Sequence, residues 1–304
     1  MNVLGRALLA VTNRSTVRKL ITGTRPGRAL STRFVAGETL EQAIAVAKEM
    51  NAKRASVSLD HLGEHVTDRA QAEAARDDYL ACLDAIGAHS INGNISVKLS
   101  QLGMGFDDEL AGASLDALAA RAMDAGTTVS IDMEESAVTD VTIDLYSAAQ
   151  RKHGNLGLAV QAYLHRTRDD LDKIMPLRGH IRLCKGAYAE PNEIAYQSRN
   201  EVNEAFDRLT NLLMSDDGVK PAIASHDTER LDVTAALAPN RSGPYEYQML
   251  YGVRPGLQDK MLAASDPLRI YVPYGVAWYP YLTRRMAERP ANIAFFIRAA
   301  LSRS

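Results

Sequence analysis

The chain has 304 residues, enough for one large domain or two of medium size, and its formal net charge of -2 argues against nucleic acid as the main partner. Hydrophobic residues make up 46% and charged residues 24%, which is ordinary for a soluble globular protein. The two cysteines, Cys82 and Cys184, fit neither a disulfide framework nor a zinc site, and no apolar run is long enough to span a bilayer. We therefore expect a reducing, cytoplasmic location and no metal.

The first 37 residues contain no Asp or Glu but several basic side chains, from Arg6 to Arg33. Three interpretations of this segment stay open. It is a basic helical lead-in packed on the domain, a helix that contacts an anionic membrane surface, or an organelle-targeting presequence. We expect residues 1–50 to be helical and to precede the first strand.

Short β-branched or apolar runs then recur with helix-like segments between most of them. The expected strands are 55–59, 94–99, 128–132, 158–163, 180–184, 221–225, 245–250 and 269–273. The expected helices include 68–85, 115–125, 138–151 and 198–213, with a last one at 291–301 after Pro290. This alternation predicts parallel strands joined by right-handed crossovers.

Eight such units in one chain favour an α/β fold of the closed (βα)8 type over about residues 51–304, within a single catalytic domain spanning 1–304. The competing fold is an open, doubly wound sheet. That fold usually carries G-x-G-x-x-G after its first strand, and no such motif follows any strand here.

Polar residues gather where the expected strands end, which is where barrel enzymes place catalytic groups. The main ones are Lys98, Asp132, Gln161, Arg182, Lys185, Ser225, His226 and Tyr271. Alternatives stay open for several of them. Lys98 and Asp132 could form a structural ion pair, Lys98 could be a Schiff-base lysine, and Gly186 could serve a turn or a phosphate. No second histidine lies at ligand spacing from His226, so metal is disfavoured.

The segment WYPYLTRRMAE at 278–288 places Tyr281, Arg284, Arg285 and Glu288 at helical spacing on one face. Two adjacent guanidiniums suit an anion such as a carboxylate, whose two oxygens match the donor fork of arginine. The alternative is a solvated basic face with an intrahelical ion pair to Glu288.

Seven segments, taken together and in order over about residues 35–300, resemble one family. They are ISVKLSQLG, SIDMEES, VQAYLHRT, IRLCKGAYAEP, ASHD, EYQMLYGV and YVPYGVAWYPYLTRRMAERPAN. Each is weak alone, but the ordered set resembles the proline dehydrogenases in their short, monofunctional bacterial form. The resemblance implies a distorted (βα)8 TIM-like barrel with additional N-terminal helices and a last helix over the barrel top.

The resemblance also implies an activity. The family binds FAD without a Rossmann domain and oxidises L-proline to Δ1-pyrroline-5-carboxylate, the first step of proline degradation to glutamate. A hydride passes from proline C5 to flavin N5, and a membrane quinone receives the electrons. Implied partners are the quinone, a separate pyrroline-5-carboxylate dehydrogenase, and the inner face of the cell membrane as a peripheral contact. The alternatives are a Schiff-base lyase using Lys98 or Lys185 and a hydroxyproline dehydrogenase, whose substrate Tyr271 would crowd.

The family's functional residues carry over by position. Asp132 and Arg182 would be catalytic, with Arg182 stabilising negative charge on the flavin and Asp132 orienting Lys98 or Tyr271. The implied substrate contacts are Lys98, Leu250, Tyr271, Tyr281, Arg284 and Arg285. The implied cofactor contacts are Met133, Gln161, Arg182, Lys185, Gly186, Ala187, Ser225, His226 and Glu288, the last of which would also orient the arginine helix.

Overall fold

The structure is a computed structural model that describes residues 32–63 and 66–288, with side chains described through Thr283. Eight parallel strands form a closed barrel in sequence order, and β8 pairs with β1 to complete it. The strands are β1 (Ser56–His61), β2 (Gly93–Val97), β3 (Val129–Ile131), β4 (Leu156–Gln161), β5 (His180–Cys184), β6 (Lys220–Ala224), β7 (Glu246–Leu250) and β8 (Leu268–Tyr274).

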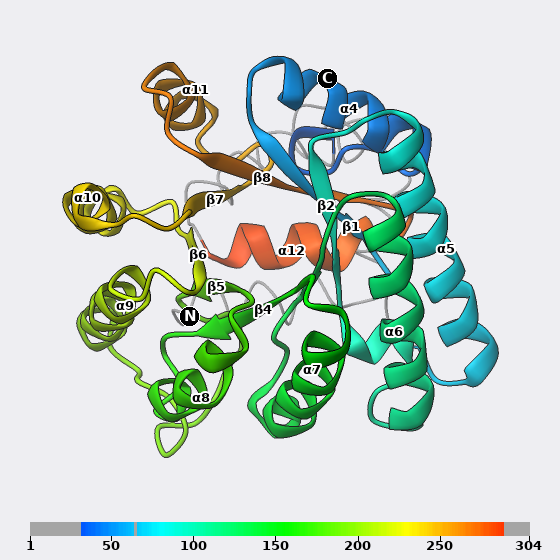
Figure 1. The fold of residues 1–304 in the computed structure, drawn as a ribbon, viewed down its shortest axis with the longest axis horizontal. Coiled ribbons are helices and arrows are strands. Elements are labelled where there is room, and N and C mark those ends of the chain that lie inside the picture. The colour runs from blue at the N-terminus through cyan, green and yellow to red at the C-terminus, as the bar shows by residue number, and fades with distance from the viewer. Residues whose placement is uncertain (1–31, 64–65, 289–304) are drawn as a thin grey trace, which may run out of the picture.

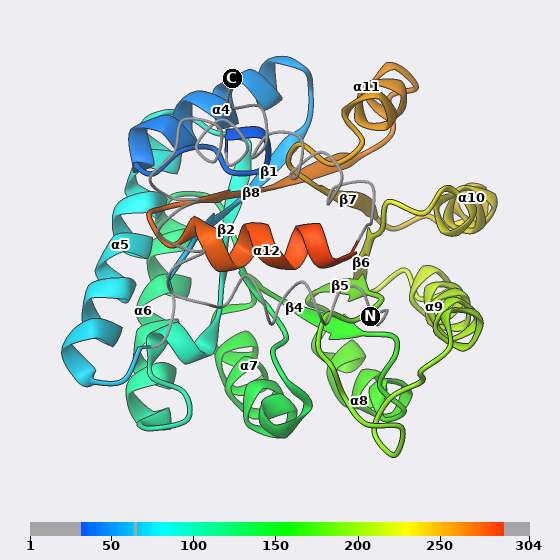
Figure 2. The same cartoon turned by 180° about the vertical axis from the view of Figure 1, so that it is seen from behind.

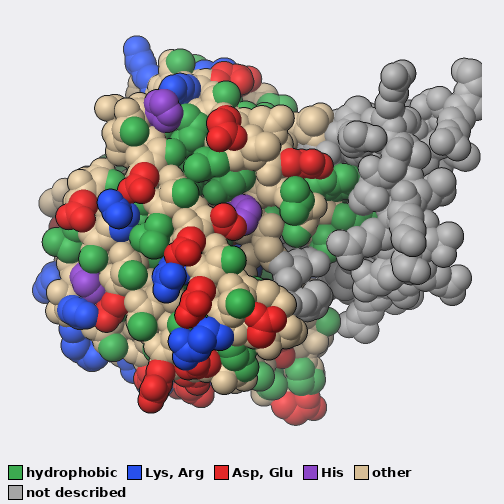
Figure 3. Space-filling model, turned by 90° about the vertical axis from the view of Figure 1, so that its right-hand side faces the viewer, with side chains coloured by type: hydrophobic (Ala, Val, Ile, Leu, Met, Phe, Trp, Pro, Cys, Tyr) green, Lys and Arg blue, Asp and Glu red, His purple; other side chains and the backbone are tan. Residues whose placement is uncertain are grey.

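Helices surround the strands as an outer ring (Figure 1). They are α4 (Leu40–Ala52), α5 (Arg69–Ala88), α6 (Asp108–Asp124), α7 (Thr139–His153), α8 (Thr167–Ile174), α9 (Arg199–Met214), α10 (Thr228–Leu237) and α11 (Pro255–Ala263), with α12 (Trp278–Glu288) following β8. Acidic and basic side chains are interspersed over the face of the described residues drawn in Figure 3.

The barrel prediction is confirmed. The first and last residues of each expected strand differ by at most two positions from those of the observed strand. The helix expected at 115–125 begins earlier, at Asp108, because the Asp107 side chain accepts a hydrogen bond from the Leu110 amide and caps it. The sequence did not name α8, α10 and α11, which are short. The α4 helix agrees with a helix before the first strand, while residues 1–31 and the helix expected at 291–301 lie outside the described residues.

The barrel interior is polar. Outward-facing strand residues such as Leu59, Val97 and Ile131 form the apolar core under the helices. Inward positions of TIM barrels are usually filled by bulky aliphatic side chains. Here, the strands on either side of β5 carry small residues level with its inward side chains, because Ala159 and Ala222 both pair with Arg182. These alanines leave room for long polar side chains to cross the interior.

A first group of interior polar side chains, which we call the lower network, lies near the start of the strands. Its members are His180, Glu246, Gln248 and Arg269. One Glu246 carboxylate oxygen accepts hydrogen bonds from Gln248 Nε2 at 2.6 Å and Arg269 Nε at 2.7 Å, and His180 Nε2 lies 3.3 Å away. Burial raises the pKa of Glu246, but attraction to Arg269 outweighs burial and holds that pKa well below its usual range. Pairing thus allows charge at this depth.

The α12 helix lies across one end of the barrel (Figure 2). Its side chains pack with residues that precede α4 and with Leu62, which follows β1. The members of this cluster are Phe34, Val35, Leu62, Trp278, Tyr279, Tyr281 and Leu282. Trp278 Nε1 also donates a hydrogen bond to Glu38 at 3.1 Å. Because α12 directly follows β8, the covered end is the carboxyl end of the strands, as the expectation of a helix over the barrel top required.

The small interior residues generate a prediction. Replacing Ala222 with Leu should lower the free energy of unfolding by about 1–3 kcal/mol, since the added volume would collide with the Arg182 side chain. Urea denaturation followed by circular dichroism measures this loss.

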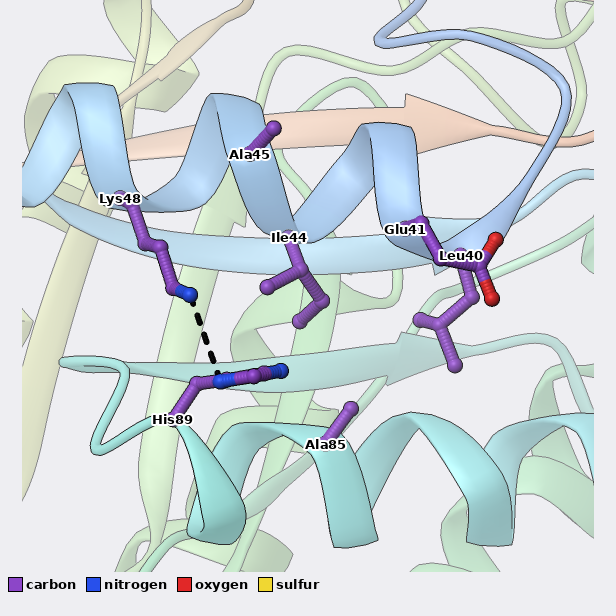
Figure 4. Close-up of a pocket in the computed structure, with 7 residues that line it drawn as sticks. All are labelled: Leu40, Glu41, Ile44, Ala45, Lys48, Ala85 and His89. Atoms are coloured by element: carbon purple, nitrogen blue, oxygen red, sulfur yellow. Dashed lines mark hydrogen bonds between the residues drawn. The ribbon is translucent and has the colours of Figure 1, made fainter.

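The control for Ala222→Leu is Ala45→Leu, which makes the same change on an exposed position of α4. Ala45 borders a shallow groove between α4 and α5 (Figure 4), where Lys48 Nζ lies 3.3 Å from His89 Nδ1. This variant should stay within about 0.5 kcal/mol of the parent protein. Equal losses of unfolding free energy in Ala222→Leu and Ala45→Leu would contradict the conclusion that the barrel interior around Ala222 is filled.

Candidate active site

Asp132 is the centre of a second group of interior side chains at the carboxyl end of the strands. Its carboxylate accepts hydrogen bonds from Ser96 Oγ at 2.8 Å and from the Tyr271 hydroxyl at 2.7 Å. It also forms ion pairs with Arg182 and, at 3.3 Å, with Lys98 Nζ. Side chains from β2, β5 and β8 and the residue after β2 therefore converge on one carboxylate. We call this group, together with Asp60 and Ser130, the mouth network.

Arg182 reaches this carboxylate from β5, which is separated from β3 by β4 alone. One terminal nitrogen donates to Ser96 Oγ at 3.0 Å and Ser130 Oγ at 2.7 Å, and the guanidinium carbon lies 5.4 Å from the centre of the Tyr271 ring. Its Nε is buried and has no hydrogen-bond partner in the described structure. A buried donor without an acceptor costs about 1–3 kcal/mol, so this nitrogen favours a ligand that offers an acceptor.

The charges of the mouth network fix its protonation states. Burial raises the pKa of Asp132, but Lys98 and Arg182 outweigh burial and hold it well below its usual range. Burial, with the negative charge of Asp132, raises the pKa of Tyr271 well above its ordinary value. Asp132 is thus an acceptor and Tyr271 a donor at neutral pH.

Lys98 is held between two carboxylates. Its Nζ donates to Asp60 at 3.1 Å in addition to the contact with Asp132, and Asp60 is only 1% exposed. The sequence reasoning missed Asp60 because the first expected strand ended at residue 59, whereas β1 continues to His61. The two carboxylates, from β1 and from the residue after β3, therefore fix the position of the Lys98 side chain.

The candidate flavin contacts from β3 and β4 lie together beside this network. Gln161 Nε2 donates to the backbone carbonyl of Glu134 at 2.9 Å, and the Ala187 amide donates to Gln161 Oε1 at 3.2 Å. Met133, which precedes Glu134 in the chain, is also buried. Gln161 therefore joins the ends of β3, β4 and β5.

Lys185 and Gly186 follow β5. We call the residues that follow the carboxyl ends of the strands the rim. Lys185 Nζ donates to Asn203 at 2.6 Å and to Asp227 at 2.7 Å. Gly186 has a φ of +128°, and a Cβ at this position would come within 2.2 Å of the Tyr163 ring. The glycine is therefore required by local packing, whatever else it binds.

Ser225 and His226 continue the rim after β6. Ser225 Oγ accepts a hydrogen bond from the Asp227 amide at 3.1 Å. His226 Nε2 accepts one from the Leu250 amide at 3.0 Å, which ties the ends of β6 and β7 together. The structure thus divides the expected site residues between the mouth network and the rim.

The remaining expected contacts belong to α12. Tyr281 is buried where this helix meets the barrel. The side chains of Arg284, Arg285 and Glu288 lie outside the described residues, so their placement stays a prediction. Within the described residues, no group of His, Cys, Asp and Glu could hold a metal ion.

Sequence reasoning left two carboxylates without a role besides Asp60. Asp227 stood inside the quoted ASHD segment and proves to pair with Lys185. Glu134 stood inside SIDMEES and accepts two hydrogen bonds from Ser100. Their position three residues after the end of a strand was the available signal, but which lysine or serine each one meets depends on the barrel's register.

The fold and the mouth network define a (βα)8-barrel enzyme whose site lies at the carboxyl end of the strands and is built for a small polar ligand. A sequence profile described as proline dehydrogenase matches residues 43–298. Proline dehydrogenase 1 of Bacillus subtilis (strain 168) is 34% identical over 284 residues, or 92% of this chain and 93% of that protein. Proline dehydrogenase of Deinococcus radiodurans is 34% identical over 281 residues, or 90% of each. The chain belongs to the proline dehydrogenase family.

Solved structures show the same fold. Proline utilization A from Bdellovibrio bacteriovorus, inactivated by N-propargylglycine, has a TM-score of 0.81 at 20% identity and covers 91% of this chain. A proline utilization A structure with proline bound in remote sites has a TM-score of 0.73 at 26% identity and covers 89%. This chain spans about a third of their lengths, 34% and 32%.

The depressed pKa of Asp132 generates a prediction. Asp132→Asn should lower the free energy of unfolding at pH 7 by about 3–5 kcal/mol, because the buried Arg182 and the partly buried Lys98 both lose a partner. A carboxyl whose pKa is depressed by folding stabilises the protein above its unfolded pKa, about 3.9, and this contribution is lost as pH falls. The difference between variant and parent in urea denaturation should therefore stay large at pH 3.5 and narrow at pH 2.5.

The control for Asp132→Asn is Asp140→Asn. Asp140 forms an exposed ion pair with Arg166, so its loss should change stability little at either pH. A stability difference for Asp132→Asn that is the same at pH 7 and pH 2.5 would contradict the role of its charge.

Proposed function

We propose that this chain oxidises L-proline to Δ1-pyrroline-5-carboxylate, with FAD as the hydride acceptor and a membrane quinone as the final acceptor of electrons. The observation that supports it most is the buried mouth network at the carboxyl end of a barrel that belongs to the proline dehydrogenase family. The product would pass to a separate pyrroline-5-carboxylate dehydrogenase in the degradation of proline to glutamate.

Charge balance supports a carboxylate clamp made partly by α12. In the mouth network, Lys98 and Arg182 are already matched by Asp60 and Asp132. A substrate carboxylate needs further positive charge to replace its lost hydration. Arg284 and Arg285 would supply that charge from α12, and Glu288 would orient them.

The ring of proline would lie against apolar and aromatic surface above the network. Tyr271 keeps its hydroxyl hydrogen bond to Asp132, so its ring is held in one orientation. Together with Leu250 and Tyr281, it would wall the five-membered ring. A hydroxyl on that ring would need room beside Tyr271, so we favour proline over hydroxyproline.

The residues present fit a flavin. When bound, FAD would accept the hydride that leaves proline C5. Arg182 offers an unpaired buried Nε–H and a fixed positive charge that favours negative charge nearby. Met133, Gln161 and Ala187 would contact the flavin ring system, while Lys185, Gly186, Ser225 and His226 would contact its ribose and phosphates.

A Schiff-base lyase is disfavoured by the lysine environments. A lysine nucleophile must be neutral, yet Lys98 lies within 3.3 Å of both Asp60 and Asp132. Lys185 Nζ likewise donates to Asp227 at 2.7 Å. The amino groups of both lysines are therefore already engaged by carboxylates, which disfavours their attack on a carbonyl carbon.

The quinone implies contact with a membrane. None of the described helices has both the length and the apolar character needed to cross a bilayer. We propose a cytoplasmic protein that touches the inner face of the cell membrane peripherally, with the basic segment before Arg33 as the contact.

The leading test of activity is optical. Purified protein should be yellow, and L-proline should bleach the flavin absorbance under anaerobic conditions, while 4-hydroxy-L-proline should be a much poorer reductant. A colourless protein that cannot be reconstituted with FAD would overturn the proposal.

Arg285→Ala is the informative variant for this test. It should stay yellow but require far more proline for bleaching, corresponding to a loss of about 2–5 kcal/mol in substrate binding. An unchanged proline requirement would remove Arg285 from the carboxylate clamp.

Membrane contact can be tested with vesicles that contain anionic lipid. The full chain should sediment with them at low salt, and deletion of residues 1–30 should reduce this binding. Unchanged binding by the shortened chain would remove the N-terminal segment from the contact.

A further inference from the structure

Glu134 is a buried carboxylate that none of the proposed roles uses. It lies three residues after the end of β3 and is 8% exposed. Its two oxygens accept separate hydrogen bonds from one residue: the Ser100 amide donates to Oε1 at 3.1 Å and the Ser100 hydroxyl to Oε2 at 2.6 Å. A carboxylate bound at both oxygens by a backbone donor and a side-chain donor is held in one orientation.

The two residues joined by this contact belong to different parts of the site. Ser100 lies two positions after Lys98, in a 3-10 helix that spans Leu99–Leu102. The backbone carbonyl of Glu134 accepts the hydrogen bond from Gln161 described above. The contact therefore connects the backbone that carries Lys98 to the segment that carries the candidate flavin contacts.

The backbone around Lys98 needs such a constraint. β2 ends at Val97, so Lys98 lies just beyond the last residue of the strand. Asp60 and Asp132 fix the position of the Lys98 ammonium group. The position of the Lys98 backbone depends on the contacts of the 3-10 helix that follows it. Ser100 is the residue of that turn whose amide and hydroxyl both bind another strand end.

We propose that Glu134 is a positioning residue, which, through its two hydrogen bonds to Ser100, places Lys98 for the substrate carboxylate. This inference rests on the proposed function, in which Lys98 binds that carboxylate. The hydrogen bonds, and not the negative charge of Glu134, carry the effect.

The chain contains a second contact of the same kind that serves as a comparison. Ser136 donates its amide at 2.8 Å and its hydroxyl at 2.7 Å to the carboxylate of Glu190. This pair joins the segment after β3 to the segment after β5 and does not involve the turn that follows Lys98. It has matching chemistry in a place where the proposal assigns no substrate role.

The test compares Glu134→Ala and Glu134→Gln by steady-state kinetics with L-proline. A misplaced binding group costs roughly ten- to a hundredfold, so the alanine variant should raise KM for proline by about that factor with a smaller change in kcat. Glutamine can accept from the Ser100 amide and donate to its hydroxyl, so Glu134→Gln should restore KM to near the parent value.

A second readout separates binding from chemistry. Cyclopentanecarboxylate carries the ring and the carboxylate but has no amine to oxidise, and its binding can be followed by perturbation of flavin absorbance. Its dissociation constant should rise in Glu134→Ala by the same factor as KM. Ser100→Ala, a smaller change that removes one of the two hydrogen bonds, should give an intermediate increase and covers the case that Glu134→Ala does not fold.

The outcomes are distinct. Glu190→Ala should leave KM for proline unchanged, and an increase equal to that of Glu134→Ala would overturn the proposal as a general loosening of the rim. An unchanged KM for proline in both Glu134→Ala and Ser100→Ala would overturn the proposal. An equally raised KM in Glu134→Gln and Glu134→Ala would also overturn it, because the effect would then come from the negative charge of Glu134. A parent protein that is not reduced by proline would instead refute the proposed function.

Discussion

The pairing of buried charge inside the barrel is the constraint on which this structure depends. Asp132 can stay ionised there only because its carboxylate is stabilised by ion pairs with Lys98 and Arg182 and by a hydrogen bond from Tyr271. Arg182 can reach it only because the neighbouring strands carry alanine at the same level of the interior. The lower network repeats this solution around Glu246. Polar pairs therefore take the place of the aliphatic layers that usually fill such a barrel.

The sequence was a good guide to the strands and a partial guide to the contacts. Runs such as HIRLC predicted β5 without error, because alternating apolar residues face the helices. The pairing of Lys98 with Asp132 was open in the sequence as one of several interpretations and is present. The bonds from Arg182 to Ser96 and Ser130 could not be foreseen, since they cross the barrel between strands far apart in the chain. Asp60 was missed through an error of two residues in one strand end.

The strand ends are also joined to one another around much of the rim. Successive links are Asp60–Lys98, Ser100–Glu134, Glu134–Gln161, Gln161–Ala187, Lys185–Asp227 and His226–Leu250. They connect the ends of β1 through β7 in sequence order. Several substrate and cofactor candidates, among them Lys98, Gln161 and Lys185, are therefore held by hydrogen bonds between the ends of neighbouring strands. Such links keep loop residues in fixed positions over a rigid barrel.

The α12 helix packs against residues that lie upstream of the region matched by the family profile. Trp278 contacts Glu38, and the helix shares an apolar cluster with Phe34 and Val35, although the family profile starts only at residue 43. A fragment trimmed to the profile, or to the first strand, would keep the whole barrel and lose the surface on which its covering helix rests. The residues before α4 thus form part of the surface on which the covering helix rests, and that part lies outside the residues matched by the family profile.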